Sequence, residues 1–345
     1  MFSFFNSINW LRKLILFGFF SLLIACQGNK KDLVSLQGST MGTTYSIKVV
    51  GSVIETQNLQ YEIDQRLSDI NAIFSTYIAS SEVSRINQSA DRRLFVSEQF
   101  EFLMHLSREV YDLSAGAFDV TVGPLVNLWG FGPNGPSNGV PDLKDIQSAM
   151  SRTGFHRLHL ADGELERPVS MYLDFSAIAK GYAVDEIAGL IEASGADSYL
   201  VEIGGEVKAK GRNLRGKYWV IGVEAPDRKV RLLHSTLPLA DLALATSGDY
   251  RNYFEHQGQI FSHSIDPRIG WPVKHTLSSV TVLHESAAMA DALATAFSVL
   301  GLEAALDIAE EENLMVFAII RDENNGYEEL SSRALSRYLE VLEKQ

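Results

Sequence analysis

Apolar residues follow two different spacings along this chain, and these spacings predict its secondary structure. Between residues 43 and 50 apolar and polar side chains alternate, which is typical of a half-buried β-strand. Over residues 56–75 apolar side chains recur every three or four positions and predict an amphipathic helix. Ser97 is expected to cap a second helix that ends near Leu113. Further helices are expected after Ser176 and over 287–300, 303–312 and 331–343.

From residue 198 to 284 the pattern changes to short runs that are typical of strands. Gly204-Gly205 separates two of these runs and suits a hairpin turn. Strands grouped together, with helices before and after them, indicate an α+β fold rather than a doubly wound one. The expected strands are residues 199–203, 206–211, 218–224, 232–239, 259–265 and 277–284, followed by 314–320.

The N-terminus has the pattern of an export signal. Arg12 and Lys13 precede an apolar run over 14–24, which is shorter than the roughly 20 residues that a membrane-spanning helix needs. The following Leu-Ile-Ala-Cys resembles a bacterial lipobox, in which Cys26 would be lipidated. An ordinary signal peptide with an incidental cysteine is the alternative. We therefore expect a signal peptide over 1–25, a lipidated polar tether over 26–37 and a single folded unit over 38–343.

Composition narrows the classes of function. The chain has 345 residues, with 30 Lys and Arg against 43 Asp and Glu, and a formal net charge of -13. An acidic chain is a poor binder of nucleic acid, because that needs basic groups to replace condensed counterions. Cys26 is the only cysteine, so an intramolecular disulfide is impossible. No metal-ligand spacing of Cys or His typical of structural zinc occurs.

Two segments in the first half of the chain combine glycine with a functional side chain. Met41-Gly42 lies at the start of the strand over 43–50. It provides either a soft apolar contact for a ligand beside exposed backbone, or only the start of a strand that follows a flexible tether. Asp119 lies among apolar and glycine residues within 114–133. A buried carboxylate needs a partner, which is either a ligand group or a nearby helix N-terminus. The glycines at 130, 132 and 135 fit the spacing of a dinucleotide-binding loop, but Pro133 and Pro136 exclude the helix that such a loop must open.

Asp174 and Lys180 lie on either side of a predicted helix start. A helix N-terminus is a natural anion site, and Lys180 is one turn further on, within reach of a phosphate. Alternatively, Asp174 and Ser176 only cap the helix.

Asp291 and Thr295 have the i, i+4 spacing that places two side chains on one helical face. Among small apolar neighbours, their side-chain oxygens are suited to act as two ligands of a hard cation such as Mg²⁺. A Thr that bonds its own helix and an Asp paired with a lysine are the alternative. His263 precedes a turn and is a candidate proton carrier.

In this order, behind a lipobox, the segments resemble the FAD:protein FMN transferases of the ApbE type over about residues 36–340. The resemblance implies a T-fold-like architecture of mostly antiparallel sheets flanked by helices, with the site between two closely packed subdomains. It implies that His263 or a carboxylate acts as the base and that Asp291 takes part in catalysis. Ala294 stands where many members carry a further Asp. Implied FAD contacts are Met41, Tyr77, Ala117, Phe118, Asp119, Asp174, Lys180 and Ile265, and implied metal ligands are the Ala177 carbonyl, Asp291 and Thr295.

The resemblance also implies the activity. FMN would pass from FAD to a Thr or Ser hydroxyl of an acceptor protein with the help of Mg²⁺, and AMP would be released. The implied acceptors are flavoprotein subunits of membrane redox pumps, and the implied location is the periplasmic side of the bacterial inner membrane. Two alternatives are an FAD pyrophosphatase that yields FMN and AMP, and a periplasmic flavin-binding lipoprotein without enzymatic activity.

Overall fold

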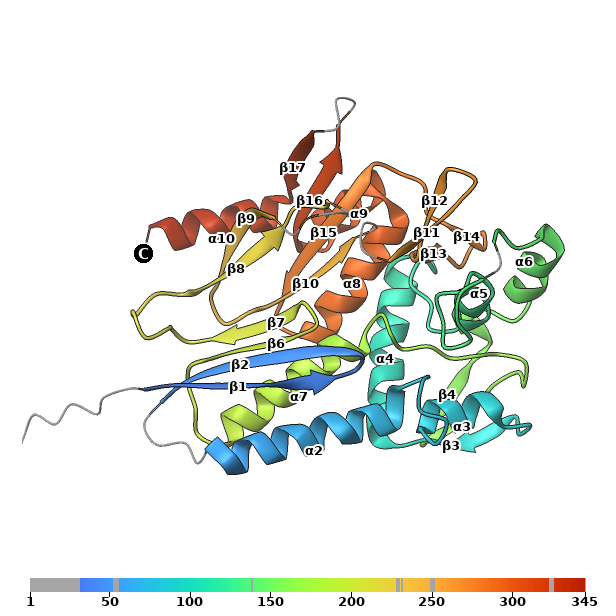
Figure 1. The fold of residues 1–345 in the computed structure, drawn as a ribbon, viewed down its shortest axis with the longest axis horizontal. Helices are drawn as coiled ribbons and strands as arrows, with labels where there is room; N and C mark the ends of the chain where they lie inside the picture. Colours follow the sequence, from blue (N-terminus) through green and yellow to red (C-terminus); the bar gives the residue numbers. More distant parts are fainter. Residues whose placement is uncertain are drawn as a thin grey trace, which may run out of the picture.

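An antiparallel sheet of eight strands runs through the middle of the molecule (Figure 1). The computed structural model describes residues 32–51, 56–137, 139–227, 230, 232–248, 252–322 and 326–344. All neighbouring strands in the sheet are antiparallel, in agreement with the expected α+β class. From edge to edge the strands are β1 (Asp32–Thr40), β2 (Thr43–Gly51), β6 (Tyr199–Ile203), β7 (Glu206–Lys210), β10 (Ala243–Gly248), β15 (Leu277–His284), β16 (Met315–Arg321) and β17 (Tyr327–Ser331).

The first strand corrects a boundary expected from the sequence. Residues 32–37, expected to be part of a polar tether, form most of β1 and pair with β2. The two strands are joined by Met41 and Gly42, whose φ angles of 51° and 73° fit a type I′ hairpin turn. Strand pairing supplies the hydrogen bonds here, so β1 forms although its polar sequence gives no clear apolar alternation.

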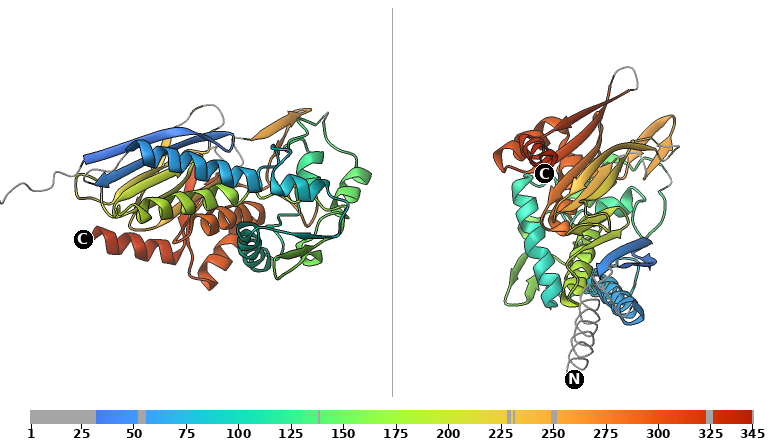
Figure 2. Two further views of the ribbon diagram at one scale, coloured as in Figure 1. Left: turned by 90° about the horizontal axis from the view of Figure 1, so that it is seen from below. Right: turned by 90° about the vertical axis from the view of Figure 1, so that its left-hand side faces the viewer.

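Helices cover one face of the sheet, and a hairpin with a further helix covers the other (Figures 1 and 2). In β6, Tyr199 and Val201 point toward the helical layer, whereas Leu200 packs into the opposite layer. The left view of Figure 2 shows α2 and α7 side by side. The helical layer contains α7 (Ala179–Ala193), α8 (Ala287–Leu300), α2 (Thr56–Phe74) and α4 (Glu98–Leu113), and the opposite layer contains β8 (Trp219–Glu224), β9 (Leu233–Leu239) and α10 (Arg333–Glu343).

Helices α7 and α8 meet at their N-terminal turns, and each caps the other. Asp291 of α8 accepts a hydrogen bond from the Gly181 N–H of α7 at 3.0 Å. In return, Asp185 of α7 accepts from the Ala288 N–H at 3.0 Å and from the Ser286 hydroxyl at 2.8 Å. A carboxylate in this position satisfies an otherwise unpaired N–H and is favoured by the helix dipole. The two helix ends are therefore fixed relative to each other.

A smaller apolar cluster forms a second subdomain beside the main sheet. Its centre is the fully buried Trp129, whose indole N–H donates to the Gly270 carbonyl at 3.0 Å. The rings of Phe254, Phe261 and Trp271 lie between 5.2 and 6.2 Å from the Trp129 ring. This subdomain is built from α5 (Gly123–Leu128), α6 (Leu143–Met150), β11 (Tyr253–His256), β12 (Gln259–Ser262), β13 (Ile265–Asp266) and β14 (Trp271–Pro272).

Most predicted helices and strands are confirmed, with small shifts at their ends. The single strand predicted over 259–265 is wrong, because β12 ends at Ser262 and a separate strand, β13, begins at Ile265. Strand β10 was not predicted, since its sequence of small residues lacks the β-branched run that marks a strand.

Within the described residues, no helix has the length and apolar character needed to cross a membrane. The remaining elements are α3 (Glu82–Gln88), β3 (Arg93–Phe95), a 3₁₀ turn (Phe155–Arg157), β4 (His159–Ala161), β5 (Glu164–Glu166) and α9 (Leu302–Glu311).

Replacing Gly181 by Ala should destabilise the protein, because a Cβ atom there would lie 2.2 Å from the Ala287 carbonyl oxygen. Overpacking of this kind costs about 1–3 kcal/mol. Gly189 is the matched control on the same helix, since nothing lies within 4 Å of the corresponding Cβ position. Gly189→Ala should be neutral or stabilise the fold by up to ~1 kcal/mol. Urea unfolding of both variants measures the difference, and equal midpoints would contradict the close helix contact.

Candidate functional site

One cavity of about 1760 Å³ opens where the main sheet, helices α7 and α8 and the small subdomain meet. It is larger than the roughly 300–1000 Å³ of most small-molecule pockets, so it has room for a dinucleotide and part of a second reactant. Cys26 lies outside the described residues. All other site residues predicted from the sequence line this cavity: Met41, Tyr77, Ala117, Phe118, Asp119, Asp174, Ala177, Lys180, His263, Ile265, Asp291 and Thr295.

The segment 117–119 forms a buried part of the cavity wall, and its own aspartate holds it in place. The backbone N–H and the hydroxyl of Thr121 both donate to Asp119 Oδ1 at 2.7 Å, and the Phe155 N–H donates to Oδ2 at 3.1 Å. Burial raises the pKa of Asp119 above its ordinary value, and these hydrogen bonds oppose the rise. The carboxylate thus has partners within the protein, and it ties this segment of the wall to Thr121 and Phe155.

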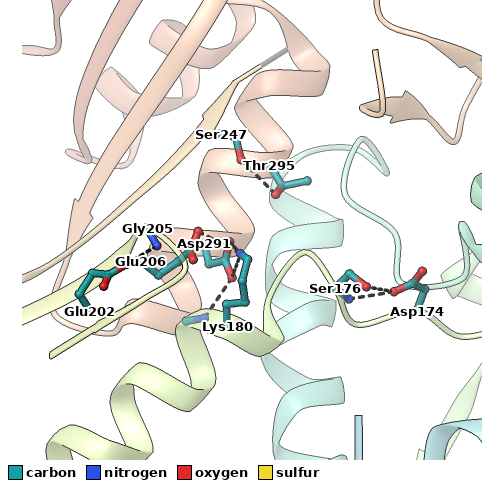
Figure 3. Close-up of polar contacts among 10 residues, drawn as sticks. Asp174, Ser176, Lys180, Glu202, Gly205, Glu206, Ser247, Asp291 and Thr295 are labelled. Carbon is teal, nitrogen blue, oxygen red and sulfur yellow. Dashed lines mark hydrogen bonds and ion pairs between the residues drawn. The ribbon is translucent and has the colours of Figure 1, made fainter. Parts of the chain in front are cut away.

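Asp174 and Ser176 form a tight turn that leads into α7 (Figure 3). Asp174 Oδ1 accepts from the Ser176 N–H at 2.9 Å and from its hydroxyl at 2.5 Å. Neither residue caps the helix, since the N-cap is Ile178, which makes no side-chain cap bond. The alternative in which Asp174 and Ser176 cap α7 is therefore wrong. The anion at this helix end is the carboxylate of Asp291, which receives the Gly181 N–H.

Three ionisable side chains from three elements meet at the cavity (Figure 3). The Lys180 ammonium lies 2.9 Å from Glu206 Oε1 on β7 and 3.4 Å from Asp291 Oδ1 on α8. Burial disfavours the charged ammonium, but Asp291 and Glu206 together outweigh it and raise the pKa of Lys180. Burial also raises the pKa of Glu206 above its ordinary value, where Lys180 opposes the rise and Asp291 adds to it. Two carboxyl groups thus share one ammonium, which favours a further cation nearby.

Thr295 and Asp291 both line the cavity from α8, as their spacing predicts (Figure 3). The Thr295 hydroxyl is 3.3 Å from the hydroxyl of Ser247, at the end of β10. The described part of the chain holds no group of three or more His, Cys, Asp or Glu side chains arranged for a metal. Asp291, Thr295 and Ala177 nevertheless line the same cavity, and their carboxylate, hydroxyl and carbonyl oxygens are the ligand types that Mg²⁺ takes when phosphates and water complete its shell.

The His263 ring is oriented by the backbone. Its Nδ1 lies 3.0 Å from the Asn252 carbonyl oxygen, and its ring meets that of Phe131 edge-on at 6.3 Å. Because a carbonyl only accepts, Nδ1 carries the hydrogen and Nε2 is the basic nitrogen of the neutral ring. His263 therefore has a defined tautomer at the cavity wall.

Sequence reasoning missed two carboxylates of the β6–β7 hairpin and one hydroxyl. Glu206 is only 4% exposed, and Glu202 accepts the Gly205 N–H at 2.8 Å. Both line the cavity, as does Ser247 on the unpredicted strand β10. The sequence contains one indication that the side chain of Glu206 faces the same way as that of Lys208, because side chains alternate along the predicted strand. Its partner Lys180 lies far away in sequence.

Comparisons with known proteins identify the family. The sequence profile described as the ApbE family matches residues 41–320. The "FAD:protein FMN transferase" of Haemophilus influenzae is 40% identical over 332 residues, covering 93% of this chain and 95% of that protein. The protein of the same name from Vibrio cholerae is 40% identical over 322 residues, covering 92% of this chain and 96% of that protein.

Solved structures agree with this match. The "Flavin Transferase ApbE from Vibrio cholerae" superimposes with a TM-score of 0.82 at 38% identity, covering 89% of this chain and 99% of that one. The apo form of the Pseudomonas stutzeri flavinyl transferase ApbE gives 0.82 at 38% identity, with 89% and 96% covered. The matched residues 41–320 include every residue that lines the cavity, the relatives and structures cover most of the chain, and we conclude that this chain belongs to the ApbE family.

Proposed function

We propose that the protein is an FAD:protein FMN transferase, which moves FMN from FAD to a hydroxyl of an acceptor protein. The observation that carries this proposal is the convergence of Met41, Asp119, Asp174, Lys180 and Asp291 on one large cavity. The same name is borne by relatives that are 40% identical over nearly the whole chain. An opening of this size suits a reaction between a dinucleotide and a protein segment.

In the proposed reaction, the hydroxyl oxygen of an acceptor Ser or Thr attacks the phosphorus of the FMN half of FAD. An O–P bond forms to the acceptor, the bond to the AMP half breaks, and AMP leaves with the electron pair. The hydroxyl proton passes to His263 Nε2, the basic nitrogen of that ring. Lys180 offsets negative charge on the pyrophosphate, because phosphoryl transfer depends mainly on positioning and charge neutralisation.

Mg²⁺ is part of this proposal. Asp291, Thr295 and the Ala177 carbonyl would hold it, and all three residues line the cavity. When bound, such an ion neutralises charge on the pyrophosphate and on the leaving AMP. The protein itself fixes the Asp291 carboxylate, which is anchored by the Gly181 N–H.

We also propose that Cys26 carries lipid and tethers the enzyme to the periplasmic side of the bacterial inner membrane, where the acceptors would be subunits of membrane redox pumps. The six-residue step from Cys26 to Asp32 reaches at most roughly 20 Å. Strand β1 then runs nine residues, or roughly 30 Å, to the Met41 turn at the cavity. A membrane-bound cysteine would thus leave the cavity free to meet acceptors within about 50 Å of the membrane surface.

The transfer activity is tested by incubating the protein with FAD, Mg²⁺ and a Thr-containing acceptor flavoprotein. Mass spectrometry should show one FMN added to the acceptor, with release of AMP, and a chelator should prevent both. Free FMN and AMP without a change in acceptor mass would identify an FAD pyrophosphatase instead. FAD binding without turnover would identify a flavin-binding lipoprotein.

Asp119→Ala should weaken FAD binding by about tenfold, because the Thr121 and Phe155 hydrogen bonds that order the cavity wall are lost. Quenching of flavin fluorescence measures the affinity. Asp119→Asn keeps an acceptor oxygen for Thr121 and should lose less. Wild-type affinity in a folded Asp119→Ala protein would remove this segment from the flavin site.

Cys26→Ser should release the protein from the membrane. Each buried CH₂ group of an acyl chain contributes about 0.8 kcal/mol to membrane binding, and the variant loses all of them. Fractionation of cells and labelling with radioactive palmitate measure the outcome. Cys26→Ser protein that stays in the membrane fraction would contradict the anchor, while FMN transfer by the released protein should persist.

A further inference from the structure

Glu206 is a buried acid that the reaction proposed above does not use. Its side chain is 4% exposed, and its Oε1 pairs with Lys180 at 2.9 Å. Its other oxygen, Oε2, has no hydrogen-bond partner in the described part of the chain, and the residue lines the cavity. A buried carboxylate with an unpartnered oxygen costs stability. Its position at the cavity therefore needs an explanation other than stability.

The distances show how Glu206 and Asp291 share one ammonium (Figure 3). The 2.9 Å contact from Lys180 to Glu206 has the length of a strong charge-assisted hydrogen bond. The contacts to Asp291 Oδ1 and Oδ2 are 3.4 and 3.5 Å, which is weak. Asp291 Oδ2 also accepts the Gly181 N–H at 3.0 Å. Within the described residues, Oδ1 of Asp291 has only the long contact to Lys180, so it keeps capacity for another cation.

A row of ion pairs between β7 and α7 sets this geometry. Alternate residues of β7 face α7, and each pairs with an oppositely charged side chain of that helix. In the pair at the cavity the acid is on the strand and the base on the helix, whereas the two pairs further along have the opposite arrangement. The pairs are Glu206–Lys180 at 2.9 Å, Lys208–Asp185 at 2.7 Å and Lys210–Glu192 at 3.0 Å.

We propose that Glu206 is a positioning residue, which holds the Lys180 ammonium away from Asp291 and so leaves Asp291 Oδ1 available to a divalent cation. This inference rests on the proposed function, because the cation is the Mg²⁺ of the transfer reaction. Without the Glu206 carboxylate, Asp291 is the nearest acid left to the ammonium. Lys180 would then close on Asp291 and compete with the metal.

The test is a titration of Mn²⁺, as a probe for Mg²⁺, into the full chain in detergent, followed by the EPR signal of the free ion. Glu206→Gln should raise the Mn²⁺ dissociation constant by about tenfold, as is typical when a residue that supports a metal ligand is removed. In the FMN transfer assay, the same variant should need about tenfold more Mg²⁺ for half-maximal rate, with a near-normal rate at saturating Mg²⁺. Unchanged Mn²⁺ affinity in Glu206→Gln would overturn the inference.

Glu202→Gln is the matched control for charge. Glu202 lies on the same hairpin and lines the same cavity, but its partner is the Gly205 N–H instead of Lys180. We expect less than about a twofold change in Mn²⁺ affinity, since the Lys180 position is untouched. An equal loss in both variants would mean that the hairpin acts only through its charge, and would overturn the role assigned to Glu206.

Glu206→Asp carries the test if Glu206→Gln does not fold. It keeps the charge but withdraws the carboxylate by one methylene from Lys180, so Mn²⁺ affinity should still fall. Wild-type affinity in this variant would overturn the inference.

Different results would overturn the role proposed for Glu206 and the proposed transferase function. A wild-type chain that transfers FMN while the Glu206 variants bind Mn²⁺ normally overturns the inference alone. A wild-type chain with neither Mn²⁺ binding nor transfer overturns both.

Discussion

The arrangement of the site depends on the contact between the N-terminal turns of α7 and α8. Gly181 allows the helices to approach, and Asp291 and Asp185 each satisfy N–H groups of the opposite helix. A side-chain cap contributes about 1 kcal/mol, so the two caps together are a substantial part of a marginal stability. Lys180 and Asp291 belong to this same contact. The groups proposed to handle the pyrophosphate are therefore held by an interaction that also stabilises the fold.

The ion pairs between β7 and α7 extend this constraint to the sheet. Lys208 pairs with Asp185, which at the same time caps α8, so one carboxylate links a strand and two helices. Because strand side chains alternate, the register that satisfies Lys208 also places Glu206 at the cavity. The inverted Glu206–Lys180 pair places a second carboxylate beside Asp291, which suits the Mg²⁺ proposed to bind there.

The position of the cavity follows from the meeting of two subdomains. The hairpin turn at Met41 and the end of β10 provide one wall, and the aromatic cluster around Trp129 provides another. In a chain with a net charge of -13, a substrate with a pyrophosphate needs local positive charge. Lys180 supplies part of it, and the proposed Mg²⁺ would supply the rest.

The sequence by itself determined the features that depend on neighbours along the chain. Helices α2 and α8, strands β6 and β15 and the shared face of Asp291 and Thr295 follow from periodicity, which is a local property. The family resemblance likewise placed residues from distant segments at one site, and the cavity brings them together.

Only the tertiary structure decided which side chains become partners. Residues 32–37 form a strand because β2 pairs with them, and Asp119 accepts a hydrogen bond from the Phe155 N–H, 36 residues further along the chain. Lys180 is shared between Glu206 and Asp291, which lie on other elements. These pairings depend on strand register and on the packing of segments that are distant in sequence, which a local pattern alone does not determine.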